Sequence, residues 1–439
     1  MKRYSEYKDS GVKWIGEIPG HWKMPKLNRV VSKVGSGSTP RGGSEVYIDE
    51  GIKFLRSQNI HFEGLNLDSV VYIPDSINEQ MKNTQVQPFD VLLNITGGSI
   101  GRCFYVDDTL GKANVNQHVC IIRPLSVNYR FLKYFLQSNS GQSQVWFYQK
   151  GDREGLSAES IKTFRLPLPP LPEQQAIVTY LDTKVAKIDE YISIAEKKIA
   201  ALEELKQSII AEAVTRGIHK EVPMKDSGVK WIGMIPEHWK IMRLRFVCEF
   251  RNGYTPSKAN PKFWENGTIP WFRMEDIRDS GRFLNEAKQY ISKEAVKGDG
   301  LFEAGSFILA TTATIGEHAM LIADSLANQR FTNLKIRKSL ISKLSRNFFF
   351  YYLFVIDEYC KSTTRKATFP SVDMTDLKNI GVSIPPIEEQ QEIVTYLDSK
   401  VANINQLCQA ERSQIEKLKE YKQRLISDVV TGKVKVTND

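Results

Sequence analysis

The sequence predicts an α+β fold in which two mixed α/β bodies are separated by two long helices that pair antiparallel as a coiled coil. Three observations support this prediction. The 439-residue chain is a tandem duplication, each copy contains one stretch with coiled-coil spacing, and the rest of each copy has the pattern of short strands and turns. Because each copy supplies one body and one helix, internal pseudo-twofold symmetry is expected.

The duplication is visible in two segments that recur almost unchanged. The first, which we call the tryptophan segment, is Lys8–Lys23, and it returns as Lys225–Lys240 with two differences. The second is Glu173–Asp182, which returns as Glu389–Asp398 with one difference. A repeat this long indicates paired domains, because solenoid repeats are only about 20–50 residues long.

The first body, about residues 24–171, combines strand and turn signals. Apolar runs of strand length lie at 70–73, 91–95 and 119–122, and a short helix is expected over 129–136. The second body, about residues 241–387, repeats the landmarks of the first but diverges between them. Its Thr-Pro, Arg and Asn-Gln landmarks follow the same order. We therefore expect one framework that is used twice, with bodies that bind different things.

Each body ends in a Pro-Pro pair, and a long helix follows at once. Pro169-Pro170 and Pro385-Pro386 hold the chain extended, and the acidic residues after them favour a helix start. Arg216-Gly217 is a typical helix end. The predicted segments are body one at 1–172, helix one at 173–217, body two at 218–388, helix two at 389–434 and a tail at 435–439.

Apolar residues recur along both helices at alternating steps of three and four, which indicates a coiled-coil seam about 60 Å long in each helix. Antiparallel pairing is favoured because a parallel partner would leave most of helix two unpaired. Lys206, Glu411 and Lys422 interrupt the seam and are expected to fix register at some cost in stability. The predicted seam residues are Val178, Leu181, Val185, Ile188, Ile192, Ile199, Leu202, Ile209, Val394, Leu397, Val401, Ile404, Cys408, Ile415, Leu418 and Leu425.

Composition narrows the class of protein. A net charge of +9 favours an anionic partner only weakly, since a basic protein without such a partner would look the same. The five cysteines are scattered and form no C-x-x-C pair, which suggests a reducing compartment. The N-terminus has no apolar core, and no apolar run approaches the roughly 20 residues needed to cross a bilayer. We therefore expect a cytoplasmic protein that does not contact membranes.

Motifs for catalysis are missing from the sequence. It contains no P-loop, no complete dinucleotide fingerprint, no methyltransferase Asn/Asp-Pro-Pro-aromatic site and no metal-spaced histidine cluster. We therefore expect no catalytic residue, no bound metal and no cofactor in this chain.

An extended ligand with twofold character, such as duplex DNA, would suit two similar bodies. Phosphate contacts need Lys, Arg or backbone donors, and base contacts need Arg, Asn, Gln, Ser or Thr. Arg56 and Arg273 occupy matching places, which a shared structural ion pair would explain equally well. The candidate DNA-contacting residues are Arg41, Arg56, Gln58, Asn59, Arg102, Lys150 and Arg153 in body one, and Lys258, Arg273, Arg278, Thr312, Thr314, Arg330, Arg365 and Lys366 in body two.

The chain resembles the specificity subunits of type I restriction–modification systems over essentially its whole length. The resemblance rests on Trp14-Ile-Gly-x-Ile-Pro19, on Thr39-Pro40, on the Pro-Pro-x-x-Glu-Gln-Gln start of each long helix and on the twofold repeat. It implies that each body is a target recognition domain that reads one half of a split, asymmetric double-stranded DNA sequence. It also implies that the helices set the gap between the half-sites.

The same resemblance implies partner proteins. Two methyltransferase subunits would dock on the helices, carry S-adenosylmethionine and methylate adenine at N6. Further motor–nuclease subunits would cleave unmethylated DNA. Two other functions remain open from the residues alone: a coiled-coil scaffold whose bodies bind proteins or glycans, and a catalytic methyltransferase, which the missing motifs disfavour.

Overall fold

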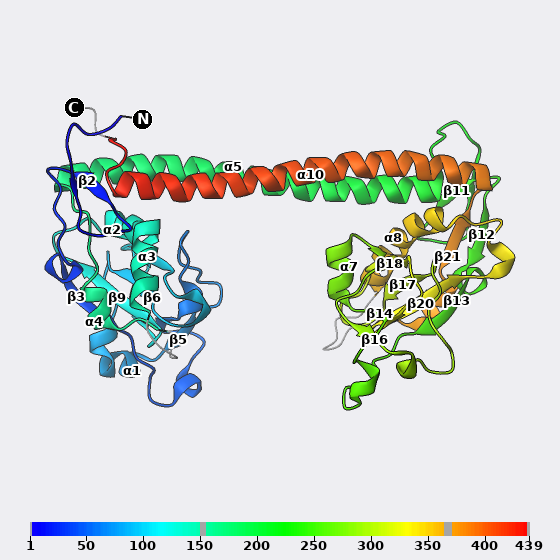
Figure 1. The fold of residues 1–439 in the computed structure, drawn as a ribbon, viewed down its shortest axis with the longest axis horizontal. Coiled ribbons are helices and arrows are strands. Elements are labelled where there is room, and N and C mark those ends of the chain that lie inside the picture. The colour runs from blue at the N-terminus through cyan, green and yellow to red at the C-terminus, as the bar shows by residue number, and fades with distance from the viewer. Residues whose placement is uncertain (1, 150–154, 364–370, 437–439) are drawn as a thin grey trace. The chain divides into compact units, whose positions relative to one another are not determined.

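The computed structural model describes residues 2–149, 155–363 and 371–436. The chain divides into two compact units (Figure 1). Unit 1 comprises Met1–Glu196 and Arg412–Asp439, and unit 2 comprises Lys197–Glu411. Each unit therefore contains one body together with a part of each long helix. The boundary between the units therefore lies within the long helices and differs from the boundary between the two copies, which the sequence places near residue 217.

The body of unit 1 is built on two small sheets. The larger sheet has the strand order β3 (Val31–Ser36), β9 (Val119–Pro124), β6 (Val91–Asn94) and β7 (Cys103–Tyr105), all antiparallel. The smaller sheet has the order β5 (Val71–Ile73), β4 (Ile52–Leu55) and β8 (Ala113–Val115), with β4 and β8 parallel. The α-helices among the described residues of this body are α1 (Asp75–Gln80), α2 (Tyr129–Gln137), α3 (Asn139–Tyr148) and α4 (Ala158–Lys162).

The body of unit 2 repeats this plan with additions. Its larger sheet has the order β13 (Cys248–Asn252), β20 (Phe331–Ile336), β17 (Phe307–Ala310), β18 (His318–Leu321) and β15 (Phe283–Leu284). Its smaller sheet has the order β16 (Tyr290–Ile291), β14 (Ile269–Phe272) and β19 (Leu326–Ala327), and β12 (Lys240–Arg243) pairs with β21 (Gly381–Ile384). The helices are α6 (Leu244–Val247), α7 (Met274–Ser280), α8 (Arg346–Thr363) and α9 (Met374–Asn379). The aromatic run that begins at Phe348 lies in α8, in the core of unit 2.

The two long helices are α5 (Leu171–Arg216) and α10 (Ile387–Val430). Each begins two residues earlier than predicted. The end of α5 is close to the prediction, but α10 ends at Val430 rather than at 434. The reason is Gly432, whose φ of 76° turns the chain out of the helix. A side chain at this position would also collide with Pro19, 2.3 Å from the added Cβ atom.

The helices pair antiparallel, as predicted. In unit 2, Lys198 contacts Glu411 at 2.5 Å and Lys206 contacts Asn405 at 3.3 Å, so the residue numbers run in opposite directions. In unit 1, Lys422 contacts Asp189 at 2.7 Å. The three charged seam residues, Lys206, Glu411 and Lys422, thus each pair with the opposite helix, which compensates for their position on the seam.

Every predicted seam residue is buried or half-buried. Leu181 and Leu397 are fully buried at equivalent positions of the two copies. By contrast, Val185 and Val401, one step further along, are half-buried. The shared pattern shows that the two helices use equivalent faces in their pairing.

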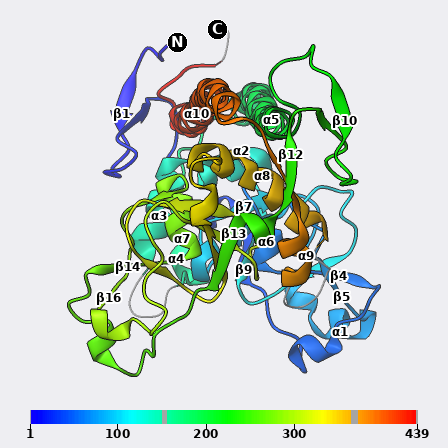
Figure 2. The same ribbon diagram turned by 90° about the vertical axis from the view of Figure 1, so that its right-hand side faces the viewer.

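Each tryptophan segment forms a joint between its body and the helices. The hairpin β1 (Tyr7–Asp9)–β2 (Glu17–Pro19) belongs to unit 1, and β10 (Met224–Asp226)–β11 (Met234–Pro236) belongs to unit 2 (Figure 2). Trp22 is fully buried and donates from Nε1 to Glu173 Oε2 at 3.2 Å. Trp239 makes the equivalent bond to Glu389 at 3.0 Å. The tryptophans therefore tie each body to the first turn of a long helix.

Over the residues that the structure describes, no helix combines the length and apolar character needed to cross a membrane. All five cysteines are buried, and none of them forms a disulfide bond within the part of the chain that the structure describes. The same described residues contain no group of three or more His, Cys, Asp or Glu side chains arranged to hold a metal ion.

Candidate nucleic-acid interface

Four loop segments meet at one edge of the unit 1 body, each at the end of a strand. The backbone N–H of Gly37 donates to Val119 O at 2.8 Å, and that of Asn116 donates to Leu55 O at 3.0 Å. The N–H of Ile95 donates to His118 O at 3.0 Å. These bonds join the ends of β3, β4, β6 and β8. We call residues 37–39, 56–58, 95–96 and 116–118 the recognition edge of unit 1.

Unit 2 builds the same edge with the same backbone bonds. Gly253 N donates to Phe331 O at 2.8 Å, Asn328 N to Phe272 O at 3.1 Å and Thr311 N to Arg330 O at 3.0 Å. The recognition edge of unit 2 therefore comprises residues 253–255, 273–275, 311–312 and 328–330. The two bodies diverge in sequence but share these backbone hydrogen bonds, which we call the backbone frame of the edge.

At each recognition edge, a glycine lies against the backbone of a neighbouring segment. A Cβ atom at Gly37 would lie 2.2 Å from Val115 O, and one at Gly253 would lie 2.1 Å from Asn328 O. No side chain can be accommodated at such distances, so glycine is required here. This explains the Gly-x-Thr sequence in both copies.

A threonine and a glutamine then meet across each edge. The Thr255 hydroxyl donates to Gln329 Oε1 at 2.5 Å, and Thr39 makes the matching bond to Gln117. Both glutamines are exposed. Because the hydroxyl holds the amide oxygen, the amide NH₂ group remains as a donor, and that of Gln117 lies 3.2 Å from His118 Nε2. Glutamine donors and acceptors at an exposed edge suit recognition of base edges.

Arg56 and Arg273 occupy equivalent positions, as the sequence indicated. Each is the residue before a short helix, and its N–H is capped by a side chain, at 2.9 Å from Asn59 Oδ1 and at 2.6 Å from Asp276 Oδ2. The guanidinium groups differ. That of Arg273 pairs with Glu275 at 2.5 Å, whereas that of Arg56 donates to Ser69 O at 3.0 Å. A shared ion pair therefore does not explain their equivalence.

The other candidates that the structure describes fall into three groups. Asn59 is fully buried and donates to Asn66 O at 2.9 Å, so its side chain maintains the fold and is not presented to a ligand. Gln58 and Arg330 are exposed on the recognition edges, and Thr312 is half-buried there. The remaining described candidates are exposed or half-buried but lie outside the edges as defined: Arg41, Arg102, Lys258, Arg278 and Thr314. Lys150, Arg153, Arg365 and Lys366 lie outside the described residues.

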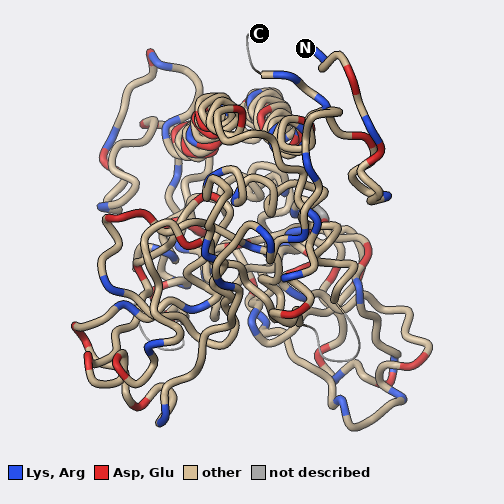
Figure 3. Tube along the Cα trace, turned by 90° about the vertical axis from the view of Figure 1, so that its left-hand side faces the viewer, with Lys and Arg blue, Asp and Glu red and all other residues tan. Residues whose placement is uncertain are grey.

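Sequence reasoning missed Gln117, His118 and Gln329 as candidates. The signal was present, because the Asn-Gln pair was recognised as a landmark of both copies. Its meaning depends on the packing of Asn116 and Asn328 against distant strands, which residue type does not reveal. Basic and acidic residues are interspersed in the bodies (Figure 3), so charge density alone does not locate the edge either.

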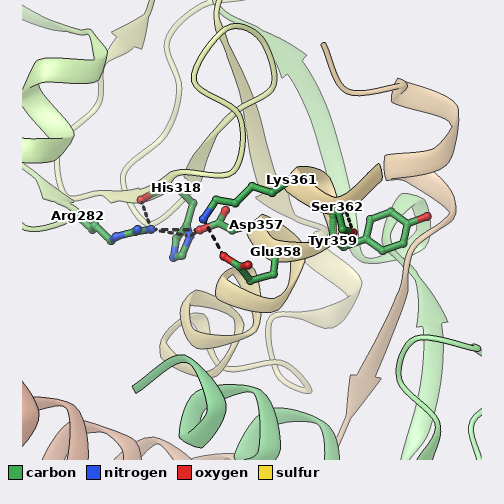
Figure 4. A network of polar contacts seen from close by, with 7 residues as sticks. All are labelled: Arg282, His318, Asp357, Glu358, Tyr359, Lys361 and Ser362. Atoms are coloured by element: carbon green, nitrogen blue, oxygen red, sulfur yellow. Dashed lines mark hydrogen bonds and ion pairs between the residues drawn. The ribbon is translucent and has the colours of Figure 1, made fainter. Parts of the chain in front are cut away.

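A buried polar cluster joins β18 to α8 in unit 2 (Figure 4). His318 Nδ1 lies 2.6 Å from Asp357 Oδ2, and the same carboxylate oxygen accepts from Arg282 at 3.2 Å. The loop before His318 rests on the same helix, where a Cβ at Gly316 would lie 2.6 Å from Asp357 O. The cluster thus ties β18 to α8 at the end of the loop that carries Thr312.

The neutral form of His318 fits this cluster. Its side chain is fully buried, and Nε2 has no hydrogen-bond partner among the described residues. Burial lowers the pKa of His318, although the Asp357 carboxylate opposes the shift. A proton on Nε2 would be left without an acceptor and would place a second positive charge beside Arg282, 3.1 Å from the ring.

Stability is therefore expected to fall as the pH drops below about 6.5, where the unfolded histidine takes up a proton that the folded one does not. Between pH 7.5 and 5.5 this single group contributes a loss of at most about 1.4 kcal/mol. Thermal unfolding of the wild type and of His318→Gln at both pH values measures this loss of stability. The variant should lose less stability than the wild type on acidification.

His219→Gln is the matched control, because the side chain of His219 is 56% exposed in the same unit. It should still show the loss of stability on acidification that His318 contributes. Equal pH dependence in all three proteins would contradict a neutral buried His318.

Known proteins are similar to this chain in sequence and in fold. The chain matches the type I restriction modification DNA specificity domain twice, over residues 19–204 and 236–417. It is 46% identical over 159 residues to the Escherichia coli type I restriction enzyme EcoprrI specificity subunit, a match that covers 35% of this chain and 40% of that protein. It is 22% identical over 433 residues to the putative MjaX specificity subunit of Methanocaldococcus jannaschii, covering 96% of both.

A solved chain from a type I R-M system, from work on its complex assembly and conformational transition, has the same fold with a TM-score of 0.70. The two chains are 19% identical, and the match covers 94% of this chain and 98% of the solved chain. The two matched segments together span well over half of the sequence, one in each copy of the duplication. The chain therefore belongs to the type I restriction modification DNA specificity domain family and contains two of these domains.

Proposed function

We propose that this chain is the DNA sequence-recognition subunit of a type I restriction–modification complex. Each body reads one half of a bipartite, asymmetric target, and the long helices set the gap between the halves. One observation carries the proposal: two recognition edges share a backbone frame but differ in exposed side chains. A duplicated frame with different side chains suits a ligand with two similar but unequal halves, which describes a split DNA sequence.

The chemistry is proposed to reside in partner proteins. Two methyltransferase subunits supply bound S-adenosylmethionine and methylate adenine at N6, and motor–nuclease subunits cleave unmethylated DNA. The contribution of this chain is to hold the target in register. Side chains at the recognition edges bind bases and phosphates, and the joints at Trp22 and Trp239 fix each body on the helices.

The helices offer surfaces on which methyltransferase subunits can dock. Large apolar side chains are exposed at Tyr191 and Ile194 of α5 and at Tyr421 of α10 in unit 1, and three more are exposed in unit 2, at Leu205, Tyr396 and Leu407. Unit 2 also has an open hollow of about 990 Å³ beside Tyr396, lined in part by His219 and Glu392. Because each unit has its own set, the arrangement supports two partner copies.

Co-expression with the methyltransferase subunits tests this proposal directly. Long-read sequencing of the host DNA should show methylated adenines in one bipartite motif with a fixed gap. Absence of methylation in any split motif would contradict the proposal. A scaffold that binds proteins or glycans would produce no sequence preference and would not co-purify with a methyltransferase.

DNA binding by the purified complex is expected to depend steeply on salt. Release of counterions from each neutralised phosphate lowers the affinity, so six to ten contacts would cost about a thousandfold or more between about 50 and 200 mM salt. Fluorescence anisotropy with a duplex that contains the methylated motif measures the slope. A scrambled duplex of the same length is the control, and an affinity independent of ionic strength would contradict the phosphate contacts.

A further inference from the structure

One loop position differs between two otherwise matching frames. Asn116 and Gln117 of unit 1 correspond to Asn328 and Gln329 of unit 2, and the residue that follows is His118 in one and Arg330 in the other. The backbone bonds and the threonine–glutamine contacts of the two loops are the same. The backbone frame is thus the same in both units, and the side chain at this position differs.

The backbone of this residue is fixed on both sides. The N–H of His118 donates to Asn116 Oδ1 at 3.2 Å, and that of Arg330 donates to Asn328 Oδ1 at 2.9 Å. The carbonyl oxygens accept from Ile95 and Thr311, each at 3.0 Å. With both backbone groups bonded, the direction in which the side chain leaves the loop is set. A side chain that must meet one base needs this kind of support.

The two side chains differ in their exposure and in their hydrogen bonds. Arg330 is exposed, and its guanidinium group has no hydrogen bond or ion pair to any described residue. His118 is half-buried, with Nδ1 2.5 Å from Thr96 Oγ1 and Nε2 3.2 Å from the Gln117 amide nitrogen. The threonine therefore orients the ring, and the ring nitrogen Nε2 lies beside the exposed glutamine.

We propose that His118 and Arg330 are equivalent specificity-determining residues, each selecting one base of its half-site, with Arg330 reading a guanine. The inference rests on the proposed DNA-recognition function and deepens it. A free guanidinium presents paired donors that match O6 and N7 of guanine in the major groove, the commonest specific contact of arginine with DNA. Both ring nitrogens of His118 already have partners in Thr96 and Gln117, so Nε2 exchanges the Gln117 amide for a base and offers one hydrogen bond in place of the paired donors of Arg330.

The test is the methylated motif of Arg330→Ala and His118→Ala, each co-expressed with the methyltransferase subunits. Loss of one good base contact should reduce the preference at one position by about ten- to hundredfold. We expect Arg330→Ala to relax one guanine of one half-site and to leave the other half-site unchanged. His118→Ala should relax one position of the opposite half-site.

Arg337→Ala is the matched control, because Arg330 precedes β20 and Arg337 follows it, at the opposite end of the same strand. It should keep every letter of the motif. If Arg330→Ala lowers methylation uniformly and keeps every letter, Arg330 contacts phosphate and the inference fails while the proposed function stands. If the wild-type complex methylates no split motif, the proposed function itself fails.

Discussion

Insertion of seven residues into both long helices is expected to change the gap of the methylated motif and to leave both half-sites intact. The insertions belong between Glu196 and Lys197 in α5 and between Glu411 and Arg412 in α10, where the two compact units divide. Seven residues preserve the coiled-coil seam and add about 10 Å to each helix. That length corresponds to about three base-pair steps at 3.4 Å each.

Long-read sequencing of DNA from cells that contain the variant complex measures the result. Methylation of the original motif should fall at least about tenfold, because both edges can no longer contact it together. Any motif that remains methylated should have the same half-sites with a longer gap. Changed half-site letters, or methylation that persists at the original gap, would contradict helices that act as the spacer.

A four-residue insertion in α5 alone is the informative control. It displaces the seam residues that follow, so Ile199 and Leu202 lose their places opposite α10. We expect this variant to lose methylation altogether, with no new gap. The contrast between the matched and the single insertion separates a change of length from a loss of helix pairing.

The helices could be predicted from sequence because their structure is determined locally. Spacing of apolar residues specifies the seam, and Gly217 specifies where α5 stops. The antiparallel direction followed from the order of the segments along the chain. The predicted end of α10 is four residues beyond the observed end at Val430, because the collision of a side chain at Gly432 with Pro19 involves residues at opposite ends of the sequence.

The recognition edges could be predicted only in part. Arg56 and Arg273 were recognised as equivalent because each stands at the same point in its copy. Residue type alone favours Asn59 as a DNA contact, although its amide caps a short helix and is buried. The edges themselves are formed by four segments that backbone hydrogen bonds bring together, and no local pattern records those contacts.

Replacement of Trp22 by alanine is expected to destabilise unit 1 by about 3–5 kcal/mol, since it removes a fully buried aromatic side chain. The loss also takes a hydrogen-bond donor from Glu173, which retains Tyr4 at 2.5 Å and His21 at 2.9 Å. Amide hydrogen exchange measures the effect locally. Faster exchange is expected at the start of α5 and at the end of α10, and exchange in the body of unit 2 should be unchanged.

Trp146→Ala provides the comparison within the same unit, because Trp146 is 64% exposed and should cost little. Trp22→Phe separates the two contributions of the joint, since it keeps most of the buried area and removes only the bond to Glu173, a loss of about 1 kcal/mol. If Trp22→Ala and Trp146→Ala cost the same, the joint does not hold the body on the helices. If exchange instead rises equally in both units, the two joints are not independent. Independent joints would allow each body to change its specificity without loosening the other, which is the property that a duplicated recognition subunit needs.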